Sequence, residues 1–331
     1  MRASRRTLTR LIALVPLPFA VMAILAGCGG GSGTPDAVRL GLLLNVTHGP
    51  AMIALQREFA HGLAGLPVEE QLFNSGPEEV SALIGGSLDA GYIGPGPYVM
   101  AESRAPGRLR LLGGVVTGGQ ALIARPGSGI RSVADLRGHA VAVPSHGNTQ
   151  DLTLRLLLSR KGLKGDDQGG EVRIIPVKNS ALGDAFAEGS VDAALAPQPY
   201  AAKLVASGDA VRVASANRAI DATHIPATVL VVTEDFARAE PTIVRALVAA
   251  NATAVVRAQA HPSAVVRAFN ARIAETTGKS VDEAVLLEAL RDMRATTRIA
   301  PGSMELMVQA AEQAGYLGGP VSPSALVPRP G

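Results

Sequence analysis

Small polar residues gather in five short loops, and each loop follows a short apolar run. The loops read NVTHGP (45–50), GPGPY (94–98), VTGGQ (116–120), PSHGNTQD (144–151) and PQPY (197–200). They are rich in glycine, serine, threonine and asparagine, whose backbone N–H groups and side-chain donors at a helix start suit a small oxyanion. No arginine lies in any of them.

The fourth loop has the pattern of a helix start that could also bind a ligand. Asn148 is a preferred N-cap residue, and Asp151 three positions later completes a variant of the capping box. Ser145, Gly147 and Thr149 place further donors around this start. The alternative is that these residues only cap a helix, and the sequence leaves both interpretations open.

The first and third loops carry the same ambiguity. Thr47 and His48 precede the Gly-Pro pair that opens the next helix, and a single loop histidine is more often structural or solvated than a ligand. Thr117, Gly118 and Gly119 could form an ordinary turn in which the glycines supply the backbone geometry. Ligand contact and a structural role both stay open for these residues.

The usual catalytic motifs are missing from the sequence. It contains no G-x-S-x-G, no H-E-x-x-H, no G-x-x-x-x-G-K-[ST] and no G-x-G-x-x-G that opens a helix. The six histidines are scattered singly, and His48 and His146, even if they met across a cleft, would be too few for a convincing metal site. Cys28 is the only cysteine, which excludes disulfides and a cysteine nucleophile elsewhere. No metal is expected, and a binding protein is favoured over an enzyme.

Strand-like and helix-like segments alternate along the chain. Apolar runs at 38–44, 68–75 and 88–93 are separated by helical patterns that begin at Pro50 and Pro77. The middle of the chain repeats this plan, with strands at 139–145, 171–177 and 191–196 and helices at 148–162 and 180–189. The alternation predicts an α/β fold with parallel sheets. After a strong strand near 225–233, the tail predicts helices that pack onto one lobe.

One phrase occurs twice. Residues 86–98 read GSLDAGYIGPGPY, and residues 189–200 read GSVDAALAPQPY. In both halves an Asn-Ser pair, Asn74-Ser75 or Asn179-Ser180, ends the preceding strand. Because the words and the order of elements agree, the repeat predicts two related lobes.

Length and composition limit the class of protein. A chain of 331 residues, 47% apolar and 18% charged, fits a folded protein of two moderate domains. The formal net charge of +3 is spread along the chain, aromatic residues are 3%, and tryptophan is absent. Nucleic acid is therefore not expected as a partner, because backbone neutralisation and base stacking would both lack their side chains.

The first residues have the layout of an export signal. A basic segment, MRASRRTLTR, is followed by an apolar run and by LAGC, which resembles the bacterial lipobox. We expect a signal peptide at 1–27, lipidation of Cys28 and a flexible tether over 28–37. An uncleaved membrane anchor is the alternative, which Pro16 and Pro18 disfavour. The SRRTLTR stretch also resembles a twin-arginine signal, so the export route stays open.

Several segments, in order and spacing, resemble the solute-binding proteins of the nitrate, aliphatic sulfonate and taurine ABC importers. They include VRLGLLLNVTHGPAMIAL, FNSGPEEVSALIGGSLDAGYIGPGPYV, ADLRGHAVAVPSHGNTQDLTLRLLLSRKGL and PATVLVVTEDF, and the similarity runs from about 38 to 320. The resemblance implies a two-lobed type II periplasmic-binding-protein fold, each lobe a mainly parallel sheet flanked by helices. Lobe 1 would comprise 38–122 and 227–331, lobe 2 would comprise 123–226, and the ligand cleft would lie between them.

Carried over position by position, the family's ligand site falls mostly on the loops already described. The residues it implies are Thr47, His48, Gly94, Pro95, Tyr98, Thr117, Gly118, His146, Gly147, Asn148, Thr149, Gln198 and Thr228. One departs from the family, because many relatives have glutamate where Gln198 stands. A neutral amide there would remove the counter-charge for an ammonium, and it favours a plain monoanion over taurine.

The resemblance implies an exported, lipid-anchored receptor that delivers a small organic oxyanion, first of all an aliphatic sulfonate, to an ABC permease and its ATPase. A monomer without a cofactor is expected. Three alternatives stay open: an enzyme of the pyrimidine-precursor type on the same fold, with His48 or His146 reacting; a binding protein that feeds a sensor kinase; and a receptor for nitrate, taurine or a pyrimidine precursor.

Overall fold

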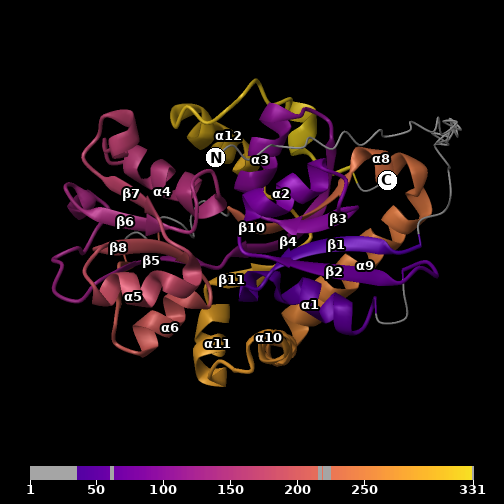
Figure 1. The fold of residues 1–331 in the computed structure, drawn as a ribbon, viewed down its shortest axis with the longest axis horizontal. Helices are drawn as coiled ribbons and strands as arrows, with labels where there is room; N and C mark the ends of the chain where they lie inside the picture. Colours follow the sequence, from indigo (N-terminus) through magenta and orange to yellow (C-terminus); the bar gives the residue numbers. More distant parts are fainter. Residues whose placement is uncertain (1–35, 60–62, 215–217, 219–224, 330–331) are drawn as a thin grey trace, which may run out of the picture. The chain divides into compact units, whose positions relative to one another are not determined.

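The computed structural model describes residues 36–59, 63–214, 218 and 225–329. Within these residues it contains two β-sheets with helices packed on their faces (Figure 1). No helix in these ranges combines the length and the apolar character needed to cross a bilayer. The predicted signal peptide and Cys28 lie outside the described residues.

The first sheet has six strands. They are β1 (Val38–Leu43), β2 (Val68–Phe73), β3 (Ala90–Ile93), β4 (Leu109–Gly118), β10 (Pro226–Thr233) and β11 (Met293–Ala295). Their order is β11-β4-β10-β3-β1-β2. β1 pairs in parallel with β2 and β3, as expected of apolar runs joined by helices. β10 lies antiparallel between β3 and β4, and β11 pairs antiparallel with β4, so the sheet is mixed.

The second sheet has five strands in the order β7-β6-β8-β5-β9. They are β5 (Gln120–Ala124), β6 (Ala140–Val143), β7 (Arg173–Pro176), β8 (Ala193–Pro197) and β9 (Val211–Arg212). β6 pairs in parallel with β7 and β8, and β5 pairs antiparallel with β8 and β9. This sheet is therefore also mixed, with parallel strands at its β7 side.

Helices cover both faces of the first sheet, because its strands are apolar on both sides. Along β10, Val229 and Val231 join a core with α2 (Gly76–Ile84), α3 (Pro95–Arg104) and α12 (Ser303–Gln313). Leu230 and Val232 join the opposite core with α1 (Gly49–Gln56), α9 (Pro241–Ala260) and α10 (Pro262–Thr277). Two shorter helices, α8 (Glu234–Ala239) and α11 (Glu283–Leu290), contribute residues to the same core as Leu230 and Val232.

The second sheet is built in the same way from smaller cores. Leu122 and Ala124 of β5 pack with α4 (Thr149–Ser159), whereas Ala121 and Ile123 pack with α5 (Leu182–Ala187) and α6 (Tyr200–Ala206). Alternate residues of one strand thus point to opposite cores, as the pleat of a strand requires.

The repeated phrase has the same place in both sheets. Its first copy forms β3 and the start of α3, and its second copy forms β8 and leads into α6. Each strand pairs in parallel with the first parallel strand of its sheet, β1 or β6, and antiparallel with a strand on its other side. The two copies therefore present equivalent corners.

The tail contacts helices that pack on both sheets. Helices α9 and α10 contact α1, but α11 contacts α6 and α12 contacts both α3 and α4. The contact between α12 and α4 is apolar. Leu152 and Leu156 of α4 share a core with Met304 and Met307 of α12. The tail thus joins elements of both sheets.

We propose two lobes on the basis of the sheets, and the strand bounds refine where they divide. β4 ends at Gly118 and β5 begins at Gln120 in the other sheet, so the first crossing lies at Gly118–Gly119 rather than after 122. The chain returns to the first sheet with β10 at Pro226.

Candidate functional site

A small cavity lies between loops that come from both sheets. Its volume is about 30 Å³, which leaves room for a group of few atoms. The lining residues follow β1, β2 and β3 of the first sheet and β6, β7 and β8 of the second, with Ala227 of β10. They are Leu43, Asn45, Thr47, His48, Asn74, Gly76, Gly94, Pro97, Pro144, Asn148, Thr149, Gln150, Asn179, Pro197 and Ala227. The carboxyl ends of parallel strands, where α/β folds bind ligands, thus face one another here.

Four helices start at this cavity. α1, α2, α3 and α4, each of eight residues or more, begin beside lining residues. The start of a helix has unpaired backbone N–H groups and a partial positive charge, which together favour an anion. None of the lining residues is lysine, arginine, aspartate or glutamate. The cavity is therefore suited to an anion of low charge held by backbone and neutral side-chain donors.

His48 is the one titratable side chain among the lining residues. It is buried, and burial lowers the pKa of its imidazole to about 3, so the ring is neutral at physiological pH. Its Nδ1 accepts the N–H of Leu43 at 3.3 Å. Because a neutral imidazole carries one proton, this bond places the proton on Nε2. His48 can thus act as a neutral hydrogen-bond donor.

The starts of α3 and α4 contact each other, although α3 follows a strand of the first sheet and α4 follows a strand of the second. Thr149 Oγ1 accepts the N–H of Gly96 at 3.3 Å. A Cβ atom on Gly94 would lie 2.3 Å from that Oγ1, and one on Gly96 would lie 2.8 Å from the backbone nitrogen of Thr149. Only glycine allows this approach. The hydroxyl proton of Thr149 stays available to donate.

Asn148 and Asp151 cap α4 as the sequence predicted. Asn148 Oδ1 accepts the N–H of Gln150 at 2.7 Å, and the carboxylate of Asp151 accepts the N–H of Gly147 at 2.8 Å. Gly147 has a φ of +72°, which other residues adopt with strain. Asn148 and Asp151 therefore do cap the helix start. Asn148 and Thr149 also line the cavity.

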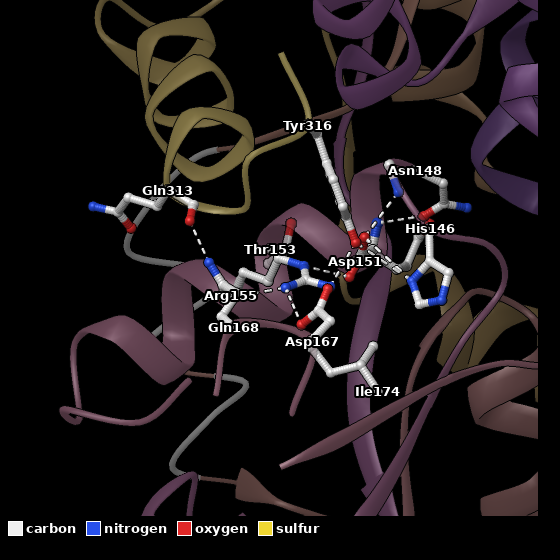
Figure 2. A network of polar contacts seen from close by, with 12 residues as sticks. His146, Asn148, Asp151, Thr153, Arg155, Asp167, Gln168, Ile174, Gln313 and Tyr316 are labelled. Atoms are coloured by element: carbon white, nitrogen blue, oxygen red, sulfur yellow. Dashed lines mark hydrogen bonds and ion pairs between the residues drawn. The ribbon is translucent and has the colours of Figure 1, made fainter. Parts of the chain in front are cut away.

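A buried polar network supports this start of α4 (Figure 2). Asp151 is fully buried and accepts a hydrogen bond from Arg155 Nε at 2.9 Å. The guanidinium of Arg155 also donates to Asp167 at 2.7 and 3.0 Å and to the hydroxyl of Tyr316 at 2.5 Å. That hydroxyl lies 3.4 Å from Nδ1 of His146. The network links the loop 146–148 to the segment that follows α12.

A larger hollow of about 480 Å³ lies beside the cavity, between α2 and α3. Its lining is mainly apolar, with Val80 and Ile84 of α2 and Met100 and Ala101 of α3. His146 and Gly147 also line it. Pro97 lines both spaces, so the two adjoin at this residue. His146 and Gly147 therefore lie outside the small cavity.

The structure brings five of the predicted site residues to the cavity: Thr47, His48, Gly94, Asn148 and Thr149. The remaining ones have other neighbours. Pro95 occupies the first turn of α3 and is buried. Thr117 Oγ1 contacts the carbonyl of Arg294 at 3.4 Å, and Gly118 belongs to the crossing between the sheets.

Three of the remaining predicted residues are engaged away from the lining. Tyr98 is fully buried in the core, where its hydroxyl donates to the carbonyl of Ala325 at 2.7 Å. Thr228 donates to the carbonyl of Thr47 at 3.0 Å and so supports a lining residue from behind. Gln198 is fully buried, and its amide donates to Asp292 and accepts from the N–H of Ala202.

Sequence reasoning missed several lining residues with amide side chains. Asn45, Asn74, Asn179 and Gln150 all line the cavity. A signal for two of them was present in the repeated Asn-Ser pairs, of which Asn74 follows β2 directly and Asn179 lies three residues after β7. Within the described residues, no cluster of three or more histidine, cysteine, aspartate or glutamate side chains could hold a metal ion.

Comparison with known proteins places the chain in a family. A model of the NMT1-like family matches residues 31–274. The taurine-binding periplasmic protein of Escherichia coli (strain K12) is 27% identical over 213 residues, 64% of this chain and 63% of that protein. A Brucella abortus protein, named only as a binding protein, is 38% identical over 131 residues. That match spans 39% of this chain and 38% of the relative's length.

Solved structures share the fold at low sequence identity. The alkanesulfonate-binding protein SsuA from Xanthomonas axonopodis pv. citri, bound to MOPS, has a TM-score of 0.71 at 19% identity, over 86% of this chain and 95% of that one. The nitrate-binding protein NrtA from Synechocystis PCC 6803 has a TM-score of 0.68 at 15% identity, over 88% and 84%. The desulfurization enzyme DSZB has a TM-score of 0.60 at 20% identity, over 88% and 96%. The chain belongs to the NMT1-like family and has the fold of the periplasmic solute-binding proteins.

Proposed function

We propose that the protein is an extracytoplasmic receptor for a small organic oxyanion, first of all an aliphatic sulfonate, which it delivers to an ABC importer. The observation that carries the proposal is the cavity where four helix starts meet and no lysine, arginine, aspartate or glutamate lines the wall. Relatives that bind taurine, sulfonates or nitrate support an oxyanion ligand. The small volume of the cavity supports nitrate as a second candidate.

Taurine is less well matched than a plain anion. Its ammonium group would need a negative partner, and the lining contains no carboxylate. This argument replaces the one based on Gln198, whose amide is engaged with Asp292 and Ala202. The site residues we propose to contact the ligand are Thr47, His48, Gly94, Asn148 and Thr149.

An enzyme on the same fold is the competing function, because DSZB shows that the fold also serves catalysis. His48 is the lining residue that could act as a base. The low pKa of its imidazole makes it a weak base, and no second titratable side chain lines the cavity with it. These features support binding without turnover.

Thermal unfolding with a panel of anions tests the receptor. The panel comprises nitrate, bicarbonate, methanesulfonate, ethanesulfonate, taurine and methylphosphonate. A true ligand at 100 times its dissociation constant should add about 2.7 kcal/mol to the free energy of unfolding. We expect this gain with a plain sulfonate or nitrate, and a much smaller one with taurine.

The result that would contradict the receptor is a panel without any shift, together with turnover of a supplied pyrimidine precursor or organosulfur compound. Thr149→Val is the matched variant, because it keeps the shape of the side chain and removes the hydroxyl at the cavity. It should reduce the shift. Cells without the protein should also lose uptake of the ligand that binds, which separates delivery to a permease from signalling to a sensor.

We also propose that the protein is exported and anchored by a lipid on Cys28. The LAGC sequence and the apolar segment before it support this location, as do the periplasmic relatives. Cells fed a radioactive fatty acid should label the wild-type protein and leave Cys28→Ser unlabelled. Equal labelling of the two proteins would refute the anchor.

A further inference from the structure

Asp292 joins the two sheets through its side chain. It lies between α11 and β11, and β11 belongs to the first sheet. Both partners of its carboxylate come from the second half of the fold: Gln198 Nε2 donates to Oδ2 at 2.6 Å, and Arg212 of β9 donates to Oδ1 at 3.1 Å and also to Oδ2. The side chain of Asp292 is 17% exposed, so these contacts are largely shielded from water.

The backbone completes a ring of hydrogen bonds at the crossing between the sheets. The carbonyl of Asp292 accepts the N–H of Gly119 at 2.8 Å, and the carbonyl of Gly119 accepts the N–H of Gln198 at 2.8 Å. The amide of Gln198 then returns to the carboxylate of Asp292. Gly118 and Gly119 have φ values of +73° and +72°, and a Cβ on Gly118 would lie 2.2 Å from the carbonyl oxygen of Asp292. Three residues distant in sequence are thus fixed together.

This ring lies directly behind the wall of the cavity. Pro197, which precedes Gln198, lines the cavity, and so does Thr47. A Cβ on Gly119 would lie 2.5 Å from Cγ2 of Thr47, so the crossing packs tightly against that residue. A shift of the ring would therefore move lining residues from both sheets.

The ring also requires a hydrogen-bond donor at position 198. A glutamate there would bring a second carboxylate to within hydrogen-bond distance of Asp292, where like charges repel. The other end of the Gln198 amide accepts from the start of α6, a role that a carboxylate could also fill. The partner that selects glutamine is therefore Asp292.

We propose that Asp292 is a positioning residue for ligand binding, which selects glutamine at 198 and holds the crossing and the cavity wall in the binding geometry. This inference rests on the proposed anion site for its effect on affinity. The contact between positions 198 and 292 can be measured without any ligand.

Exchange of the two side-chain types tests the proposal. We expect Gln198→Glu and Asp292→Asn each to weaken ethanesulfonate binding at least about tenfold by calorimetry. The first sets two carboxylates against each other, and the second removes the charge opposite Arg212 and turns one acceptor oxygen into an amide donor. The double variant Gln198→Glu/Asp292→Asn restores one amide and one carboxylate, and it should bind within about threefold of wild type. Urea unfolding should show the same recovery. Asp235→Asn, at a carboxylate whose side chain is 81% exposed, is the matched control and should bind as wild type does.

The outcomes are distinguishable. Additive losses in the double variant, in both binding and unfolding, would overturn the selection of glutamine by Asp292, and wild-type affinity in Asp292→Asn would overturn its positioning role. If a single variant does not fold, recovery of folded protein in the double variant supports the proposal and its failure counts against it. If wild type binds neither ethanesulfonate nor nitrate, the proposed function and the effect on affinity both fail, while the unfolding measurements still decide whether Asp292 selects glutamine.

Discussion

Lowering the pH from 8 to 5 will cost the wild-type protein about 2 kcal/mol of unfolding free energy that the His48→Asn variant retains. The cause is the burial of His48, which lowers the pKa of its imidazole to about 3 from an ordinary value of 6.5. Between these values the unfolded chain binds a proton that the folded protein does not. Stability is therefore fully present above pH 6.5 and is lost as the pH falls through this window.

Urea unfolding of both proteins from pH 8 to pH 5 measures the effect. Asparagine is the chosen replacement because its side-chain oxygen can accept the N–H of Leu43, as Nδ1 does. Glu79 acts in the opposite direction, because burial raises the pKa of its carboxyl, but it is common to both proteins and cancels in the difference. Parallel curves for wild type and His48→Asn would contradict a neutral buried imidazole.

Removing the guanidinium of Arg155 should lower the free energy of unfolding by about 3–5 kcal/mol, because Arg155→Met leaves the buried carboxylate of Asp151 without its counter-charge. Asp151 is fully buried, and beyond Arg155 its strong partner is the N–H of Gly147 (Figure 2). The loop 146–148 is fixed by that bond, so ligand affinity should fall together with stability. Urea unfolding and calorimetry with the binding anion measure the two effects.

The double variant Asp151→Asn/Arg155→Met separates charge from packing. Asparagine keeps an acceptor for the N–H of Gly147 and removes the uncompensated charge, so most of the lost stability should return. Arg137→Met is the control, since its ion pair with Glu171 is exposed and should contribute at most about 1 kcal/mol. A double variant no more stable than Arg155→Met would show that the charge is not the cause.

The elements and about a third of the residues that line the cavity could be predicted from local sequence. Apolar runs gave the strands, and the repeated Gly-Ser, Asp-Ala and Pro-x-Pro-Tyr words identified equivalent corners in the two sheets. Asn148 and Asp151 were recognised as a helix start because capping depends on residues only a few positions apart. Thr47, His48 and Thr149 came from the same kind of local pattern, and all three line the cavity.

The rest of the site depends on contacts between distant residues. The sequence predicts that Gln198 contacts the ligand, whereas its side-chain amide donates to Asp292 in the structure. Asp292 is 94 positions away and lies in a short stretch without a motif. Tyr98 was carried over as a ligand contact, and its hydroxyl instead meets Ala325, 227 positions away. No periodicity or spacing reports such pairs, because they arise only when the tail packs against both sheets.

The strand order β11-β4-β10-β3-β1-β2 also fixes when the first sheet can be completed during synthesis. β3 and β4 do not pair with each other, because β10 lies between them, and β10 follows both in the chain by more than a hundred residues. Until residue 233 is available, β3 keeps one edge without its partner and β4 keeps both, because β11 follows later still, and open edges invite wrong pairing. Closing so long a stretch of chain is also slow. A nascent chain stopped before β10 would therefore lack the residues of β10 that both cores of this sheet share, so the first sheet can form only after its second half has been synthesised.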